Sequence, residues 1–205
     1  MNRLLCFHGT SYESGMSIIN SKHFNASANE NLRMGEGAYF FCQMGDSPDY
    51  AIRCAREVEK YHYKEGKHTS KYMVISCEVE CDEESFLDLC DPRQVEAFHE
   101  MRYVMLNKSL KEMPEFEYKS AAVADTQVFD ELRSMYGITV IRCPQFFGML
   151  AEEQKFRFPK GTHPYPKTYV PNVFNVCVNT EKVAIRNLKI VEEGDWNDEI
   201  GSEVG

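Results

Sequence analysis

The sequence contains no apolar run long enough to cross a membrane as a helix, which takes about 20 residues. The apolar stretch at its start, residues 1–7, turns polar at His8 and is too short for a secretory signal peptide. We therefore expect a cytoplasmic protein that has no membrane partner.

The eight cysteines include no Cys-x-x-Cys pair, and the closest two are Cys77 and Cys81. Scattered cysteines are typical of reduced thiols in a cytosolic protein rather than of a disulfide framework. The spacing of Cys77, Cys81 and Cys90 is also wrong for a zinc site completed by a histidine. We therefore expect no metal cofactor.

Internal repeats, low-complexity linkers and a glycine-rich phosphate loop are also absent. Without that loop, alternating short strands and helices favour an α+β fold over a Rossmann domain. A chain of 205 residues is expected to form one domain with its own core. We place this domain at residues 1–192, followed by an acidic, frayed C-terminal tail at residues 193–205.

Apolar periodicity and turn residues predict the secondary structure. The first strand covers residues 4–7 and delivers His8, Gly9 and Thr10 to a turn. Further strands are expected at residues 38–42, 72–79, 138–141, 175–178 and 183–191. Helices are expected at residues 11–20, 48–63, 91–110 and 125–136.

The motifs that carry chemistry lie between Phe7 and Tyr50. His-Gly-Thr occupies residues 8–10, Gly-Glu-Gly-Ala-Tyr-Phe occupies residues 35–40, and Ser47 precedes Tyr50 by three positions. Taken singly, each of these residues is also an ordinary core or turn residue. The functional prediction therefore depends on their joint order and spacing.

These motifs resemble the first two signatures of the H-Y-E class of ADP-ribosyltransferases, which includes diphtheria toxin and the poly(ADP-ribose) polymerases. The resemblance is closest to small bacterial toxins or defence effectors of that class. It implies an ADP-ribosyltransferase-like fold of split antiparallel β-sheets with flanking helices. It also implies NAD as a substrate, and a toxin of this kind would travel with an antitoxin or chaperone protein.

The resemblance assigns residues to the NAD site. Tyr39 and Tyr50 would sandwich nicotinamide, a flat cationic ring that aromatic faces attract. Gly9 and Ser47 would hold its carboxamide. The implied NAD-binding residues are His8, Gly9, Thr10, Tyr39, Ser47 and Tyr50.

His8 and Thr10 would engage the ribose on the adenosine side of NAD. The third position of the class is usually a glutamate, but this chain offers Asn175 or, by a different alignment, Asn172. We prefer Asn175, so the implied catalytic residues are His8, Tyr39 and Asn175. An asparagine can hydrogen-bond a ribose hydroxyl but cannot act as a base. This departure favours mono-transfer, and it leaves open that the protein only binds NAD.

Residues 154–180 contain no acidic residue, although the net charge of the chain is −9. Basic and aromatic side chains alternate there between prolines, a pattern typical of proteins that bind single-stranded nucleic acid. A long loop whose aromatic rings pack on the domain would have the same composition. The predicted acceptor-binding residues are Lys155, Phe156, Arg157, Phe158, Lys160, Tyr165, Lys167 and Tyr169.

The resemblance implies a mono-ADP-ribosyltransferase, and the composition of residues 154–180 favours nucleic acid, either RNA or DNA, as its acceptor. Transfer to protein and hydrolysis of NAD are the alternatives among enzymes. A regulatory module that binds NAD or ADP-ribose without catalysis is the alternative from another class.

Overall fold

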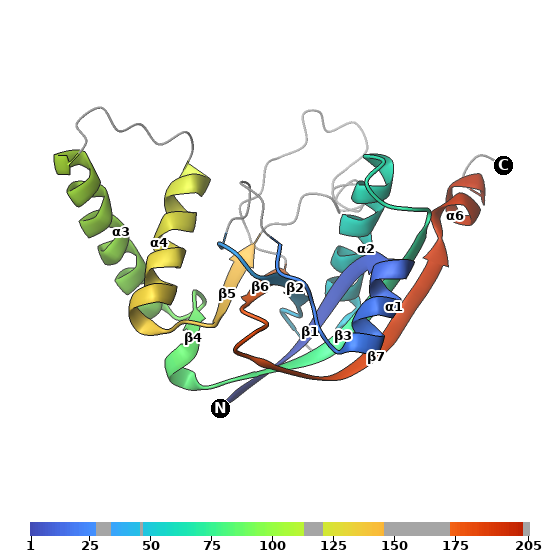
Figure 1. Ribbon diagram of the computed structural model, residues 1–205, viewed down its shortest axis with the longest axis horizontal. Coiled ribbons are helices and arrows are strands. Elements are labelled where there is room, and N and C mark those ends of the chain that lie inside the picture. The colour runs from blue at the N-terminus through green and yellow to red at the C-terminus, as the bar shows by residue number, and fades with distance from the viewer. Residues whose placement is uncertain (28–33, 46, 113–120, 146–172, 203–205) are drawn as a thin grey trace.

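The computed structural model describes residues 1–27, 34–45, 47–112, 121–145 and 173–202 of the chain (Figure 1). Its strands are β1 (Asn2–Ser11), β2 (Ala38–Cys42), β3 (Lys71–Cys81), β4 (Phe86–Asp88), β5 (Val140–Gln145), β6 (Val173–Val178) and β7 (Ala184–Asp195). Its helices are α1 (Tyr12–Ser21), α2 (Asp49–Lys64), the short 3-10 helix η1 (Glu83–Ser85), α3 (Pro92–Glu112), α4 (Ala121–Tyr136) and α6 (Trp196–Ser202). The α+β class expected from the sequence is confirmed.

The strands form one seven-stranded sheet in the order β4-β5-β6-β2-β1-β3-β7. Neighbouring strands are antiparallel except β4 and β5, which are parallel. In the middle of the sheet, β1 and β2 pair only at Cys6↔Cys42 and Phe7↔Phe41. The resemblance implied split antiparallel sheets, and the structure has two half-sheets that two residue pairs join into one sheet, in which one strand pair is parallel.

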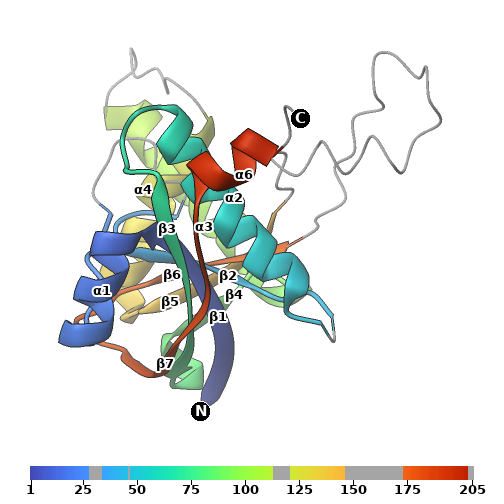
Figure 2. The ribbon, with the colours of Figure 1, turned by 90° about the vertical axis from the view of Figure 1, so that its right-hand side faces the viewer.

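Helices cover both faces of this sheet. α1 packs on one face, where Ile18 lies in the same apolar cluster as Cys6. α2 packs on the opposite face, where Ala55 lies in a cluster with Phe7. Figure 2 shows α1 and α2 on either side of β1 and β3. α3 and α4 cover the half-sheet that contains β4, β5 and β6. A third apolar cluster lies beneath these two helices and includes Phe129 of α4.

The first strand is longer than its sequence predicted. All of residues 2–11 have partners on β3, including Gly9 opposite Val74. The turn expected at residues 8–10 is therefore wrong, because the His-Gly-Thr motif continues the strand. Pairing with a strand far away in the sequence outweighs the local signal of a glycine, which usually weakens strands.

The acidic tail, expected to fray, is structured as far as residue 202. β7 runs to Asp195, which pairs with Lys71 of β3, and α6 follows directly. Trp196, the only tryptophan of the chain, is fully buried and stacks on Tyr72 with the ring centroids 4.0 Å apart. One large buried aromatic side chain therefore anchors a segment whose charge pattern alone predicted disorder.

Replacing Trp196 with alanine should lower the free energy of unfolding by about 3–5 kcal/mol, as expected for a buried large aromatic residue. The substitution removes the ring that stacks on Tyr72 and that lies 5.6 Å from the Lys60 ammonium. Chemical denaturation followed by far-ultraviolet circular dichroism measures the change. Trp196→Phe is the matched control, since it keeps an aromatic ring on Tyr72 and should lose less. Equal stability of Trp196→Ala and the wild type would show that α6 is not anchored by this ring.

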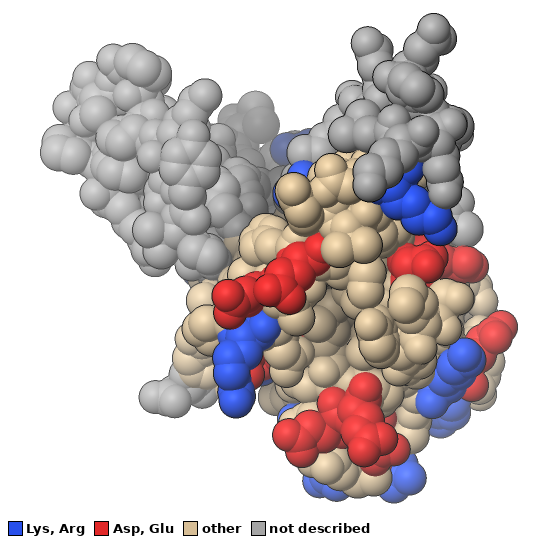
Figure 3. Space-filling model, turned by 90° about the vertical axis from the view of Figure 1, so that its left-hand side faces the viewer, with Lys and Arg blue, Asp and Glu red and all other residues tan. Residues whose placement is uncertain are grey.

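The described surface carries charges of both signs. On the face drawn in Figure 3, acidic side chains gather in separate groups, and basic side chains lie beside several of them. The basic and aromatic residues expected to bind the acceptor, at 155–169, lie outside the described residues. None of the described helices combines the length and the apolar composition needed to cross a membrane.

Candidate functional site

The two motifs meet where the half-sheets join. β1 and β2 pair only over residues 6–7 and 41–42, although β1 continues to Ser11 and β2 begins at Ala38. We call the region where β1 and β2 do not pair with each other the β1–β2 fork. It comprises residues 8–11 of β1 and 38–40 of β2, which pair instead with β3 and β6 on their other edges. Two strand edges that do not pair with each other leave backbone groups that a ligand can satisfy.

His8 crosses the β1–β2 fork. Its Nδ1 lies 2.9 Å from the backbone carbonyl oxygen of Tyr39, and a carbonyl only accepts, so Nδ1 carries the proton and donates it. The ring packs against Phe24 and Phe40, with centroid distances of 5.3 and 5.6 Å. Burial lowers the pKa of His8, so the imidazole is neutral at physiological pH. Its Nε2 is therefore a hydrogen-bond acceptor.

Gly9 lies directly against α2. A Cβ atom at this position would lie 1.9 Å from the carbonyl oxygen of Ala55, and the backbone of a helix cannot rotate out of the way. Only glycine therefore allows α2 to approach β1 this closely. Thr10 is buried on the face of the sheet that His8 occupies, since alternate residues of a strand point to the same face.

Tyr39 is held by the loop that precedes β2. Its hydroxyl donates to the carbonyl oxygen of Gly35 over 2.7 Å and accepts from the amide of Met34 over 3.0 Å. Gly35 has a φ of 79°, a left-handed conformation that glycine adopts without strain. Burial raises the pKa of Tyr39, so its hydroxyl stays protonated and keeps donating.

Ser47 precedes α2 by two residues, and Tyr50 lies in the first turn of that helix. Ser47 is exposed, and its Oγ accepts a hydrogen bond from the amide of Asp49 over 3.3 Å. The ring of Tyr50 is partly buried in the apolar cluster beneath α2, whereas the ring of Tyr39 belongs to the cluster beneath α3 and α4. The structure therefore places the two tyrosines in different apolar clusters.

Asn175 lies on β6, next to β2. Its neighbour Cys177 pairs with Tyr39, so Asn175 and Tyr39 point to the same face of the sheet. Its Nδ2 donates to Oε1 of Gln145 over 2.8 Å, while its buried Oδ1 has no hydrogen-bond partner among the described residues. A buried acceptor without a partner costs about 1–3 kcal/mol, so Oδ1 is suited to receive a hydroxyl from a ligand.

The structure brings part of the predicted site together. His8 contacts the backbone carbonyl of Tyr39, while its ring packs on Phe40, on the face opposite to the one that the side chains of Tyr39 and Asn175 share. The alternative third residue, Asn172, lies outside the described residues, as do the predicted acceptor-binding residues at 155–169.

Two residues that support the site were missed in the sequence. Gln145 accepts the hydrogen bond of the Asn175 amide. Arg133 of α4 donates to the carbonyl oxygens of Glu36, over 2.7 Å, and of Met34, over 3.3 Å. Both contacts join segments that are far apart in the chain, so no local pattern could have signalled them.

A polar pocket of about 340 Å³ adjoins the loop that holds Tyr39. Two of its lining residues, Glu36 and Gly37, belong to the second motif, but His8, Tyr39 and Asn175 do not line it. It is therefore separate from the site that the motifs predict. The lining residues are His23, Asn25, Ala26, Glu36, Gly37, Asp130, Arg133, Asn179, Thr180 and Glu181.

No family model matches this chain. The chain is similar to uncharacterized protein MJ0359 of Methanocaldococcus jannaschii, with 21% identity over 209 residues. The alignment covers 96% of this chain and 88% of that protein, so the two have similar extents. The name of this relative states no activity, and the identity is too low to show a family.

Proposed function

We propose that this protein is a mono-ADP-ribosyltransferase of the H-Y-E class, with the corresponding fold, that transfers ADP-ribose from NAD to a macromolecular acceptor. The observation that carries the proposal is the contact between the two motifs at the β1–β2 fork. His8 and Tyr39, which are 31 positions apart, are joined there by a hydrogen bond. Short motifs that matched the class by chance would have no reason to meet at one point of the fold.

Several groups at the fork are suited to NAD. Nε2 of His8 would accept a hydrogen bond from a ribose hydroxyl, and the backbone of Gly9 would face the nicotinamide carboxamide. Oδ1 of Asn175, which lacks a partner among the described residues, would accept a hydroxyl of the other ribose. The resemblance would put nicotinamide between the rings of Tyr39 and Tyr50, which belong to different apolar clusters in this structure.

In the proposed reaction, the bond between the nicotinamide nitrogen and C1′ of the ribose breaks, and its electron pair leaves with nicotinamide. A nucleophilic atom of the acceptor bonds to the oxocarbenium-like C1′ and loses its proton to water. Asn175 would orient the ribose but cannot remove that proton. The site therefore suits an acceptor atom that is already nucleophilic, and the addition of a single ADP-ribose. No step requires a metal.

Nucleic acid is the acceptor that the composition favours. Residues 154–180 contain no acidic residue and carry the basic and aromatic side chains predicted to bind the acceptor. The chain as a whole has a net charge of −9. Such side chains bind phosphates and stack on bases. Transfer to a protein and transfer to water, which is NAD hydrolysis, use the same NAD site and remain the alternatives.

The asparagine at the third position also favours a second candidate. A regulatory module that binds NAD or ADP-ribose has no need of a base, and Asn175 would still hold the ribose hydroxyl. This candidate shares the NAD site with the first and differs from it only in turnover.

Labelled NAD, incubated with the purified protein and with total RNA, single-stranded DNA or lysate protein, tests the proposal. We expect label on a macromolecule that nuclease removes. Label that only protease removes would make the acceptor a protein, and free ADP-ribose alone would make the reaction hydrolysis. If NAD is bound but unchanged in every mixture, the regulatory module is the function that the result supports. NAD that is neither bound nor consumed would refute both candidates.

A further inference from the structure

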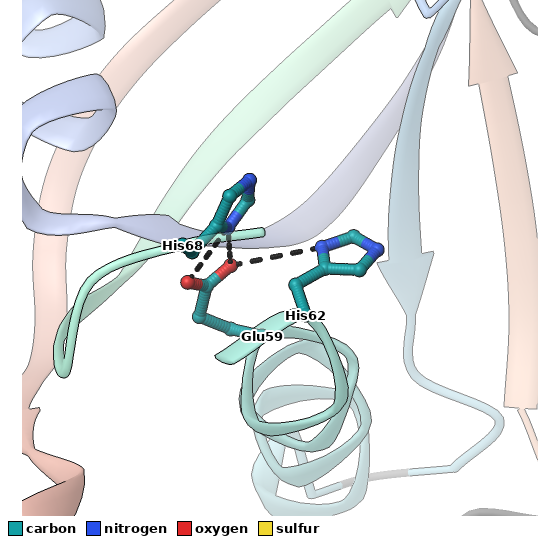
Figure 4. A group of neighbouring side chains, drawn as sticks. All are labelled: Glu59, His62 and His68. Atoms are coloured by element: carbon teal, nitrogen blue, oxygen red, sulfur yellow. Dashed lines mark hydrogen bonds and ion pairs between the residues drawn. The ribbon is translucent and has the colours of Figure 1, made fainter. Parts of the chain in front are cut away.

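Three side chains with metal-ligand chemistry gather at the C-terminal end of α2. Glu59 and His62 are three residues apart on the helix and share one of its faces, and His68 follows in the loop after it (Figure 4). Nδ1 of His68 lies 2.8 and 2.7 Å from the two carboxylate oxygens of Glu59. Nδ1 of His62 lies 3.9 Å from Oε2 of the same carboxylate.

The carboxylate of Glu59 is buried without a permanent positive charge beside it. Its side chain is 0% exposed, whereas the side chains of His62 and His68 are 34% and 32% exposed. In the described part of the chain, the ion-pair partners of Glu59 are these two histidines, with no lysine or arginine among them. Buried carboxylates are normally paired with a cation or bound to a metal. The two imidazoles, in turn, connect the carboxylate to solvent.

We propose that Glu59, His62 and His68 bind a divalent transition-metal ion, of which zinc fits the ligand set best. Two imidazole nitrogens and one carboxylate are the protein ligands of open zinc sites, where water takes the fourth position. Ligand atoms around tetrahedral zinc lie about 3.4 Å apart, given metal–ligand distances near 2.1 Å. The observed Glu–His distances of 2.7 and 3.9 Å lie on either side of this value, and all three ligand atoms lie within 4.8 Å of one another, so side-chain rotations would complete the site.

The ion would replace the proton that now lies between Nδ1 of His68 and the carboxylate, because both groups bind metals in their deprotonated forms. It would also tie the loop after α2 to the helix that packs on Gly9. No metal was expected from the sequence. Only the Glu-x-x-His spacing within the helix expected at residues 48–63 was a local signal, since His68 reaches the pair through the loop. The site is independent of ADP-ribose transfer.

Titration of the chelator-treated, full-length protein with zinc chloride, followed by calorimetry, tests the proposal. We expect one equivalent to bind to the wild type and to raise its melting temperature. His62→Ala and His68→Ala, which replace partly exposed side chains, should fold and lose at least about ten-fold in zinc affinity, as removal of even a supporting partner does at metal sites. The matched control is His99→Ala, an exposed histidine of α3, which should bind zinc as the wild type does.

Cobalt(II) serves as a second probe, because its visible spectrum reports the type of ligand. Bands of a cobalt ion with nitrogen and oxygen ligands, lost in His62→Ala and His68→Ala, would support the site. The charge-transfer band of a cobalt–thiolate bond would place the metal on the cysteines and overturn the proposal. Absence of zinc binding by the wild type, or unchanged binding by both histidine variants, would overturn it as well.

Discussion

Gly9→Ala is expected to destabilise the protein by about 3 kcal/mol or more, the upper part of the range for an overpacked core. The added methyl group would lie 1.9 Å from the carbonyl oxygen of Ala55 and 2.5 Å from its carbonyl carbon. Both atoms belong to the backbone of α2, so relief requires the helix to move away from β1. Urea denaturation, monitored by the fluorescence of the single tryptophan, Trp196, measures the loss.

Gly45→Ala is the matched control for this substitution. Among the described residues, no atom lies within 4 Å of a Cβ built at Gly45. The same chemical change there should alter the free energy of unfolding by no more than about 0.5 kcal/mol. If both alanine variants unfolded at the same urea concentration as the wild type, the close approach of α2 to β1 would be wrong.

His8→Ala is expected to reduce ADP-ribose transfer by at least about 100-fold, a loss typical of substrates that are no longer held in the reactive geometry. The substitution removes Nε2, the proposed acceptor for a ribose hydroxyl, and the hydrogen bond to the Tyr39 carbonyl oxygen. The initial rate of label transfer from NAD at saturating acceptor measures the effect.

Two controls separate this effect from a loss of folding. His99→Ala should transfer ADP-ribose at the wild-type rate, because His99 is exposed on α3 and belongs to neither motif. The tryptophan fluorescence of His8→Ala should match that of the wild type, since Trp196 is buried against Tyr72, which pairs with Ser11 and not with His8. Full activity of a folded His8→Ala protein would remove His8 from the site.

The elements with strong local signals were predicted well from the sequence. The apolar run of β2, bounded by glycines, is confirmed at Ala38–Cys42, and the end of α4 at Tyr136 precedes the expected glycine. Hydrophobic periodicity and capping residues are local signals, so the helices and strands that they specify can be recognised from a single sequence.

The errors arose where distant parts of the chain decide the structure. The His-Gly-Thr motif was assigned to a turn, but β3 pairs with it throughout. The tail was expected to fray, but Asp195 pairs with Lys71 and Trp196 is buried against Tyr72. Contacts between residues more than sixty positions apart leave no periodic trace in either segment.

The candidate site shows the same division. The motif spacing predicted that His8 and Tyr39 share a site, and they do share a contact. The way in which they meet, through a backbone carbonyl rather than two side chains, depends on how the strands diverge at the fork. The partner of Asn175, Gln145, lies on a third strand and became visible only in the fold.

The β1–β2 fork as the NAD site is the central claim, and calorimetric titration of NAD into the wild type and into His8→Ala tests it most directly. The measurement does not depend on the acceptor or on turnover. We predict one NAD bound per chain in the wild type and at least about ten-fold weaker binding in His8→Ala, a loss of about 1.4 kcal/mol for one hydrogen-bonding side chain. Absence of NAD binding by the wild type, or equal affinity in the two proteins, would contradict the claim.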